Sequence, residues 1–122
     1  MTRLFGAAIL SFLCALSVPV SAFADGFSDV RGKQEFLGLV NGKALTRLGI
    51  SLNVTPNGQI EGRAFGQPVT GAWRWSDGLF CRDLYFGSRD LGANCQLVQR
   101  NGDTLRFISD AGRGQFADLR LK

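Results

Sequence analysis

The chain has 122 residues, of which 45% are hydrophobic and 20% charged, and its 14 Lys and Arg against 10 Asp and Glu give a formal net charge of +4 at pH 7. It contains no histidine, which excludes the commonest general base, the commonest metal ligand and every nucleophile that a histidine activates. The basic residues are scattered singly along the chain, a distribution that does not indicate nucleic-acid binding.

The first 24 residues have the pattern of a cleaved secretory signal peptide. Arg3 is followed by the apolar run Leu4–Val20 and by Ala22-Phe23-Ala24, an A-x-A cleavage site. Serine and proline interrupt the run, which is shorter than the ~20 residues of a transmembrane helix, so we expect no membrane span after cleavage. Loss of Arg3 leaves 13 basic against 10 acidic side chains, and we expect the mature protein in the periplasm or outside the cell.

Residues 25–32 are polar and contain glycine, and they predict a loose lead-in to the domain. The segment 33–40 then places Phe36, Leu37 and Val40 at the i, i+1 and i+4 spacing of a short amphipathic helix. Asn41-Gly42 directly after it is a typical helix end. We expect no other helix.

From Lys43 onward the chain consists of short alternating segments separated by turn residues, the pattern of an all-β sandwich or barrel. Thr55-Pro56-Asn57-Gly58, Ser76-Asp77-Gly78 and Asn101-Gly102-Asp103 are three such turns. The predicted strands lie near 43–47, 50–54, 59–65, 68–75, 79–86, 93–99, 104–109 and 115–121. We therefore predict one all-β domain over residues 33–122, with one short N-terminal helix and about eight strands in an antiparallel meander that forms a small barrel.

Two cysteines remain in the mature chain, because Cys14 lies within the predicted signal peptide. Cys81 and Cys95 fall on neighbouring predicted strands, and an even pair in an oxidising compartment favours a disulfide. Such a bond would fix the register of the two strands and stabilise the domain by roughly 3 kcal/mol.

One nominal cofactor motif occurs near the end of the chain. Gly112-Arg113-Gly114-Gln115-Phe116-Ala117 matches the dinucleotide fingerprint G-x-G-x-x-G/A. A Rossmann site needs a helix at this loop, a further strand and an acidic residue ~20 positions on, and the sequence to Lys122 leaves no room for them. We expect no cofactor, and without histidine or a D-x-D-x-D-G loop we expect no metal site.

The remaining acid–base groups for an enzyme are carboxylates, namely Asp77, Asp83 and Glu61. General acid–base catalysis needs two carboxylates that converge in one cleft. Asp77 lies in a predicted turn, and the spacing of the three residues does not indicate convergence. An enzyme working through carboxylates is therefore an alternative function, and no catalytic residue is predicted.

The segment 71–83 is the densest in large aromatic side chains, and two tryptophans share one face of its strand. These aromatics suit the lining of a ligand cavity, with an arginine near the barrel mouth for an anionic group. They also suit the filled core of a small barrel, and this second interpretation is favoured at this domain size, since side chains often fill barrels of eight strands. The candidate ligand-binding residues are Trp73, Trp75, Tyr85 and Arg82.

The motif Gly71-x-Trp73-x-Trp75-x-Asp77-Gly78-x-Phe80-Cys81-Arg82-Asp83, with Cys95 and the closing Leu105-x-Phe107, resembles a group of small secreted bacterial proteins of about this length. The resemblance covers most of the mature chain, and some members carry the name dihydrodipicolinate reductase. That enzyme family has an N-terminal Rossmann domain and a paired-histidine catalytic motif, and no position of this chain matches either. In architecture, the chain is also loosely similar to periplasmic β-barrel inhibitors of proteases and lysozymes.

These observations together predict a non-catalytic, monomeric barrel protein that binds a small ligand or a periplasmic protein partner. A carboxylate enzyme and a structural protein of the cell envelope are the alternatives.

Overall fold

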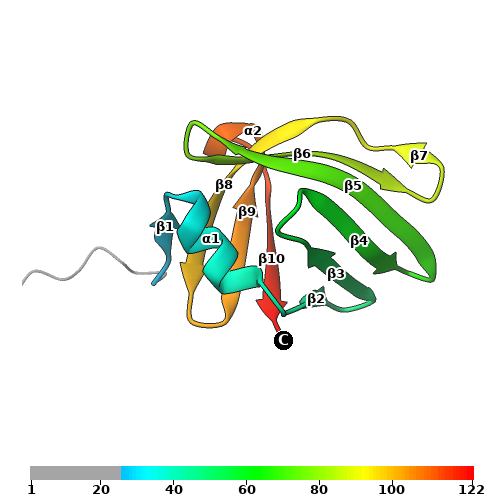
Figure 1. Ribbon diagram of the computed structural model, residues 1–122, viewed down its shortest axis with the longest axis horizontal. Helices are drawn as coiled ribbons and strands as arrows, with labels where there is room; N and C mark the ends of the chain where they lie inside the picture. The colour runs from blue at the N-terminus through cyan, green and yellow to red at the C-terminus, as the bar shows by residue number, and fades with distance from the viewer. Residues whose placement is uncertain (1–25) are drawn as a thin grey trace, which may run out of the picture.

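The computed structural model describes residues 26–122, and the predicted signal peptide, residues 1–24, lies outside them. Within the described range the chain forms ten strands and two short helices (Figure 1). In chain order these are β1 (Ser28–Val30), α1 (Lys33–Val40), β2 (Leu45–Arg47), β3 (Ile50–Val54), β4 (Gln59–Ala64), β5 (Gln67–Ser76), β6 (Leu79–Phe86), β7 (Arg89–Asp90), β8 (Asn94–Asn101), β9 (Thr104–Ile108), α2 (Ser109–Gly112) and β10 (Phe116–Leu121).

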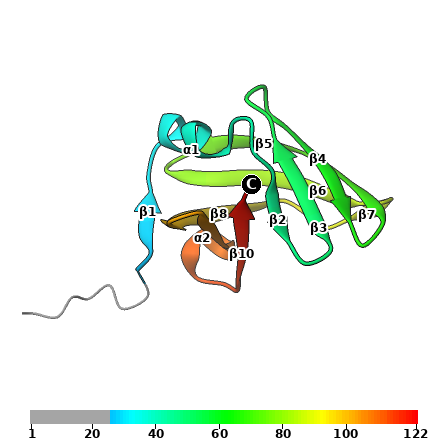
Figure 2. The same cartoon turned by 90° about the horizontal axis from the view of Figure 1, so that it is seen from below.

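Eight of these strands form a closed antiparallel barrel. They follow one another around the wall in the order β2, β3, β4, β5, β6, β8, β9 and β10, and β10 pairs back onto β2. Strands that are neighbours in sequence therefore lie side by side, as Figures 1 and 2 show. The predicted fold class, an all-β small barrel with an antiparallel meander of about eight strands, is confirmed.

The alternation of side chains places one face of each strand inside the barrel. On β5, Val69 and Trp73 are buried whereas Thr70 and Arg74 are exposed, as the period of two in a strand requires. The buried core cluster consists of Val30, Phe36, Val40, Leu45, Val54, Ile60, Trp73, Phe80, Val98, Leu105, Phe107 and Leu119.

Helix α1 occupies one end of the barrel, and it crosses from β1 to the start of β2 (Figure 1). Its Phe36 is completely buried. The Phe36 ring centroid lies 5.1 Å from those of Trp75 and Phe80 and 5.4 Å from that of Trp73. Phe36 therefore plugs this end of the barrel with an aromatic cluster.

The prediction of a loose lead-in over residues 25–32 is wrong for Ser28–Val30, which form β1. This strand pairs with the second half of β8, and its Val30 is fully buried. β6 pairs with the same edge of β8 at residues 94–96, and β1 pairs with the part of that edge that lies beyond β6. The sequence around Val30 is polar and has no alternation that would predict a strand. The strand forms because it pairs with β8, some seventy residues away.

The prediction of a single helix also missed α2, a short turn between β9 and β10. Its Asp110 and Ala111 have φ values of 56° and 57°, so it is not a regular helix and has no apolar periodicity. Asn94 holds it in place, because the Asn94 amide donates to the Asp110 carboxylate at 2.8 Å and accepts from the Asp110 backbone N–H at 2.9 Å. Neither helix of residues 26–122 is long and apolar enough to cross a bilayer.

Candidate functional site

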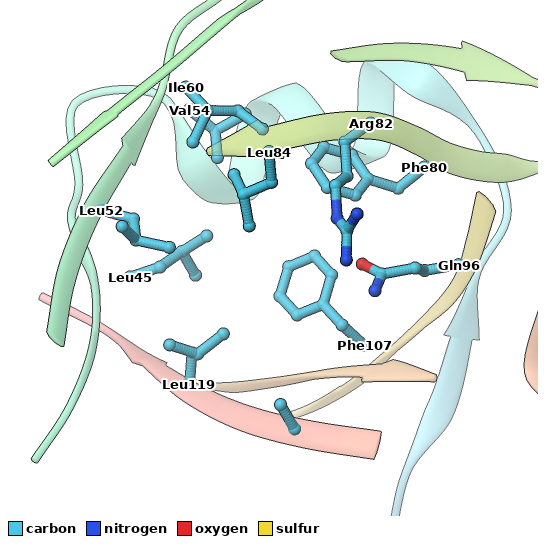
Figure 3. A pocket seen from close by; sticks show the side chains of 11 residues that line it. Leu45, Leu52, Val54, Ile60, Phe80, Arg82, Leu84, Gln96, Phe107 and Leu119 are labelled. Atoms are coloured by element: carbon cyan, nitrogen blue, oxygen red, sulfur yellow. The ribbon is translucent and has the colours of Figure 1, made fainter. Parts of the chain in front are cut away.

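The interior of the barrel contains a cavity of about 180 Å³ that is partly open (Figure 3). Phe80 and Phe107 form its floor, since both rings contact Phe36 of the aromatic plug and also line the cavity. Its lining residues come from seven of the eight barrel strands and are Leu45, Leu52, Val54, Ile60, Phe80, Arg82, Leu84, Gln96, Phe107, Ala117 and Leu119. Nine of these side chains are apolar, so the cavity suits an apolar ligand.

Small residues at inward positions help to explain why the barrel is not filled. Gly62 lies between the buried Ile60 and Ala64, and a Cβ atom there would lie 2.1 Å from the Ser51 carbonyl oxygen. Gly71 on β5 has the same constraint, with 2.2 Å to the Asp83 carbonyl oxygen. Both positions require glycine for the close approach of neighbouring strands, and neither contributes a side chain to the interior.

Two polar side chains, Arg82 of β6 and Gln96 of β8, enter the cavity and point toward one another (Figure 3). The Arg82 Nη1 donates to the Gly92 carbonyl oxygen at 2.7 Å. The Gln96 Nε2 lies 3.4 Å from the Ser109 hydroxyl, at the long limit of a hydrogen bond, and the residue is only 8% exposed. The polar groups are thus confined to one side of an otherwise apolar space.

The guanidinium of Arg82 is half-buried and carries its charge without a carboxylate partner. Among residues 26–122, the salt bridges join Arg31 to Asp29 and Arg106 to Asp118, and none involves Arg82. Burial lowers the pKa of Arg82 from its ordinary value by desolvation, and the charge of Asp83 opposes this in part. The side chain nevertheless remains a cation at neutral pH, because arginine is not deprotonated in proteins.

A second apolar hollow, of about 320 Å³, adjoins the cavity and shares Leu52 and Leu84 with it. It is lined by Ile50, Leu52, Ala64, Phe65, Val69, Leu84, Phe86 and Leu91. Phe65 is 68% exposed and Leu91 47% exposed, so this second hollow is open to solvent, and we call it the mouth. The mouth and the cavity offer one continuous apolar wall along Leu52 and Leu84.

The predicted ligand-binding residues lie in different places. Arg82 lines the cavity. Trp73 and Trp75 belong to the aromatic plug, where their indole N–H groups donate to the carbonyl oxygens of Thr55 and Arg31 at 2.9 and 3.3 Å. Tyr85 is 41% exposed and lies on the outward face of β6. The structure therefore separates Arg82 from the three aromatic residues with which the sequence grouped it.

Sequence reasoning missed Gln96, although a signal for it was present. Gln96 and Val98 share one face of β8 by alternation, and the apolar Val98 marks that face as the inward one. The sequence analysis likewise did not single out the aliphatic residues that line the cavity.

The three candidate carboxylates lie outside both hollows. Asp77 occupies the β5–β6 turn with a φ of 54°, and Glu61 and Asp83 are exposed on outward positions of β4 and β6. In the part of the chain that the structure describes, no three Cys, Asp or Glu side chains lie close enough together to hold a metal ion.

The predicted disulfide between Cys81 and Cys95 is confirmed. The two residues face each other in the pairing of β6 with β8, which comprises only Phe80 with Gln96, Cys81 with Cys95, and Arg82 with Asn94. The bond thus reinforces a short seam in the barrel wall, directly beside both polar residues of the cavity.

No protein-family model, curated protein or solved structure matches this chain. The functional argument therefore rests on the geometry of the barrel interior.

Proposed function

We propose that this protein is a non-catalytic binding protein of the periplasm or extracellular space that holds a small, largely apolar ligand inside its barrel. The cavity carries the proposal, because side chains fill the interior of many eight-stranded barrels and here leave about 180 Å³ open. An apolar cavity of roughly 150 Å³ in a protein core is enough to bind benzene. The volume thus suits a ligand of that size, or the end of a longer chain.

The disulfide supports the proposed compartment. Structural disulfides persist in oxidising environments and are rare in the cytosol. The Cys81–Cys95 bond agrees with the export that the signal peptide predicts, and its place at the barrel seam suits a binding site that must keep its shape.

A test of this function uses a neutral probe, so that it depends on the apolar cavity alone. We would titrate 1-hexanol into the protein purified from cells that express the full chain, and follow the methyl NMR signals of the lining leucines. The variant Ala117→Phe places a benzyl group in the cavity, whereas the control Ala72→Phe places the same group on the exposed face of β5.

We expect saturable, millimolar binding that shifts the signals of Leu52, Leu84 and Leu119, that is lost in Ala117→Phe and that is kept in Ala72→Phe. Binding that survives in Ala117→Phe, or no saturable binding to the unmodified protein, would contradict the proposed function.

A further inference from the structure

The polar end of the cavity has more hydrogen-bonding capacity than the protein uses. A guanidinium has five N–H donors, and within residues 26–122 only the bond from Arg82 Nη1 to the Gly92 carbonyl is formed. Gln96 is more than nine-tenths buried, and its Nε2, which carries two N–H donors, makes only the long contact to Ser109. Buried polar groups in native proteins nearly always have partners, so these two side chains indicate a missing one.

The charge of Arg82 restricts what that missing partner can be. The cavity contains the Arg82 cation, the neutral Gln96 amide and no carboxylate, and its other lining residues are aliphatic or aromatic. A half-desolvated cation without a counter-ion is unfavourable, and a bound anion would relieve this through charge-assisted hydrogen bonds. Since one guanidinium balances one negative charge, the matching head group is a monoanion, and the planar fork of arginine fits the two oxygens of a carboxylate.

The remainder of the site defines the other end of the ligand. From Arg82 the apolar wall runs past Leu84 and Leu52 into the mouth, whose lining residues are all apolar. A flexible hydrocarbon chain can follow this wall, with its far end near Phe65 and Leu91. A polar tail would leave the mouth residues without an apolar partner.

We infer that the ligand of this barrel is a medium-chain monocarboxylic acid, whose carboxylate binds Arg82 and Gln96 and whose alkyl chain fills the cavity and the mouth. This inference rests on the proposed function and adds the chemical class of the ligand to it. The carboxylate accepts from the free N–H groups of Arg82 and from the Gln96 amide, while the chain lies along Leu84 and Leu52.

The test compares three probes with the same chain, namely octanoate, 1-octanol and octyl sulfate, by calorimetry on the full protein. We expect octanoate to bind at least tenfold more tightly than 1-octanol and more tightly than octyl sulfate. Lengthening the acid from butanoate is expected to raise the affinity about fourfold per methylene, and then to level off once the chain end reaches solvent at the mouth.

Variants of the head-group site separate the contribution of charge from that of shape. Arg82→Met is expected to weaken octanoate binding about ten- to hundredfold and to leave 1-octanol unaffected or tighter, because a hydrogen bond to a charged group is lost. Arg82→Lys keeps the charge without the planar fork and is expected to fall in between. Gln96→Leu is expected to lower octanoate affinity a few-fold. The control Arg74→Met removes an exposed arginine from the outer face of β5 and is expected to change nothing.

Equal affinities for octanoate and 1-octanol, or octanoate binding that is unaffected in both Arg82 variants, would overturn the carboxylate inference while leaving the proposed function intact. Tighter binding of octyl sulfate would overturn it in favour of a sulfate or phosphate monoester. Binding of none of the probes, the neutral alcohol included, would overturn the proposed function itself.

Discussion

Arg82 and Gln96 lie diagonally across the Cys81–Cys95 disulfide, one on each strand of the barrel seam, and both side chains enter the cavity (Figure 3). Because only three residue pairs join β6 to β8, the covalent bond between the middle pair fixes the separation of the two polar groups. Beyond Arg82, β6 leaves β8 and pairs with β7 instead, which opens the wall beside the mouth. The disulfide therefore serves both the stability of the barrel and the geometry of the head-group site.

The double substitution Cys81→Ala, Cys95→Ala is expected to lower the free energy of unfolding by about 3 kcal/mol, the value for a loop of this length. Urea unfolding monitored by tryptophan fluorescence measures this. The same variant is expected to lose more affinity for octanoate than for 1-octanol, since the head-group site depends on the seam. An equal loss for both probes would show that the bond supports only the barrel as a whole.

Phe36→Ala is expected to lower the free energy of unfolding by about 3 to 5 kcal/mol, because it removes the fully buried ring of the aromatic plug. The matched control is Gln34→Ala, an exposed position on the same helix. Urea unfolding of both variants decides the matter. A loss below about 1 kcal/mol for Phe36→Ala would mean that α1 is not part of the cooperative core.

Arg82→Met is expected to raise the thermal midpoint of the ligand-free protein, because it replaces a partly desolvated cation in an apolar cavity by an apolar side chain. Replacement of buried ion pairs by hydrophobic residues stabilises some proteins by about 1 to 4 kcal/mol, and we expect a smaller gain for the half-buried, unpaired Arg82. Calorimetry of protein stripped of ligand provides the measurement. A fall in the midpoint would show that the bond to Gly92 makes Arg82 a structural residue instead of a binding residue.

Phe65→Asn tests the mouth. Phe65 has a φ of 50° in the β4–β5 turn, a conformation that suits asparagine better than an aromatic residue, yet its ring is 68% exposed. The substitution relieves this backbone strain but removes the packing of the ring against Gly49, and the two effects oppose each other. We therefore expect the free energy of unfolding to change by less than about 1 kcal/mol. Affinity for dodecanoate is expected to fall while that for butanoate stays constant. The control Tyr85→Ala, at an outward-facing position, is expected to alter neither affinity. If Phe65→Asn lowered the affinities for dodecanoate and butanoate equally, the assignment of the mouth would be contradicted.

Arg106→Lys tests how β1 is anchored. The Arg106 guanidinium binds both oxygens of Asp118, at 2.8 and 3.0 Å, and lies 3.9 and 4.0 Å from the ring centroids of Phe27 and Phe116. Lysine keeps the charge but cannot stack on the two rings or form the second hydrogen bond. We therefore expect the free energy of unfolding to fall by about 1 kcal/mol. Hydrogen exchange at the amides of Ser28–Val30 is expected to accelerate, and unchanged exchange would show that β8 alone holds β1.

The barrel strands and α1 could be predicted from the sequence because each carries a local signal. The helix Lys33–Val40 has its apolar residues at helical spacing, and Asp77-Gly78 adopts the positive φ values that a tight hairpin turn requires. β1 and α2 have no comparable signal, since one is stabilised by a distant strand and the other by Asn94 across a loop.

The candidate site could be predicted only in part: the position of Arg82 could be predicted, but the residues that surround it could not. Alternation places Arg82 on the inward face with Phe80 and Leu84, so a role near the barrel interior followed from the sequence. Which inward residues belong to the plug and which line the cavity could not be predicted from the sequence, because this depends on where Phe36 enters the barrel. That insertion takes Trp73 and Trp75 into the plug and leaves the leucines around the cavity.

A crystal structure of the full protein with octanoate tests the central claim most directly. Our account predicts electron density for the carboxylate within hydrogen-bond distance of the Arg82 guanidinium and the Gln96 amide, with the alkyl chain running along Leu84 and Leu52 to Phe65. A cavity without ligand density at saturating octanoate, or octanoate bound only on the outer surface, would contradict the account.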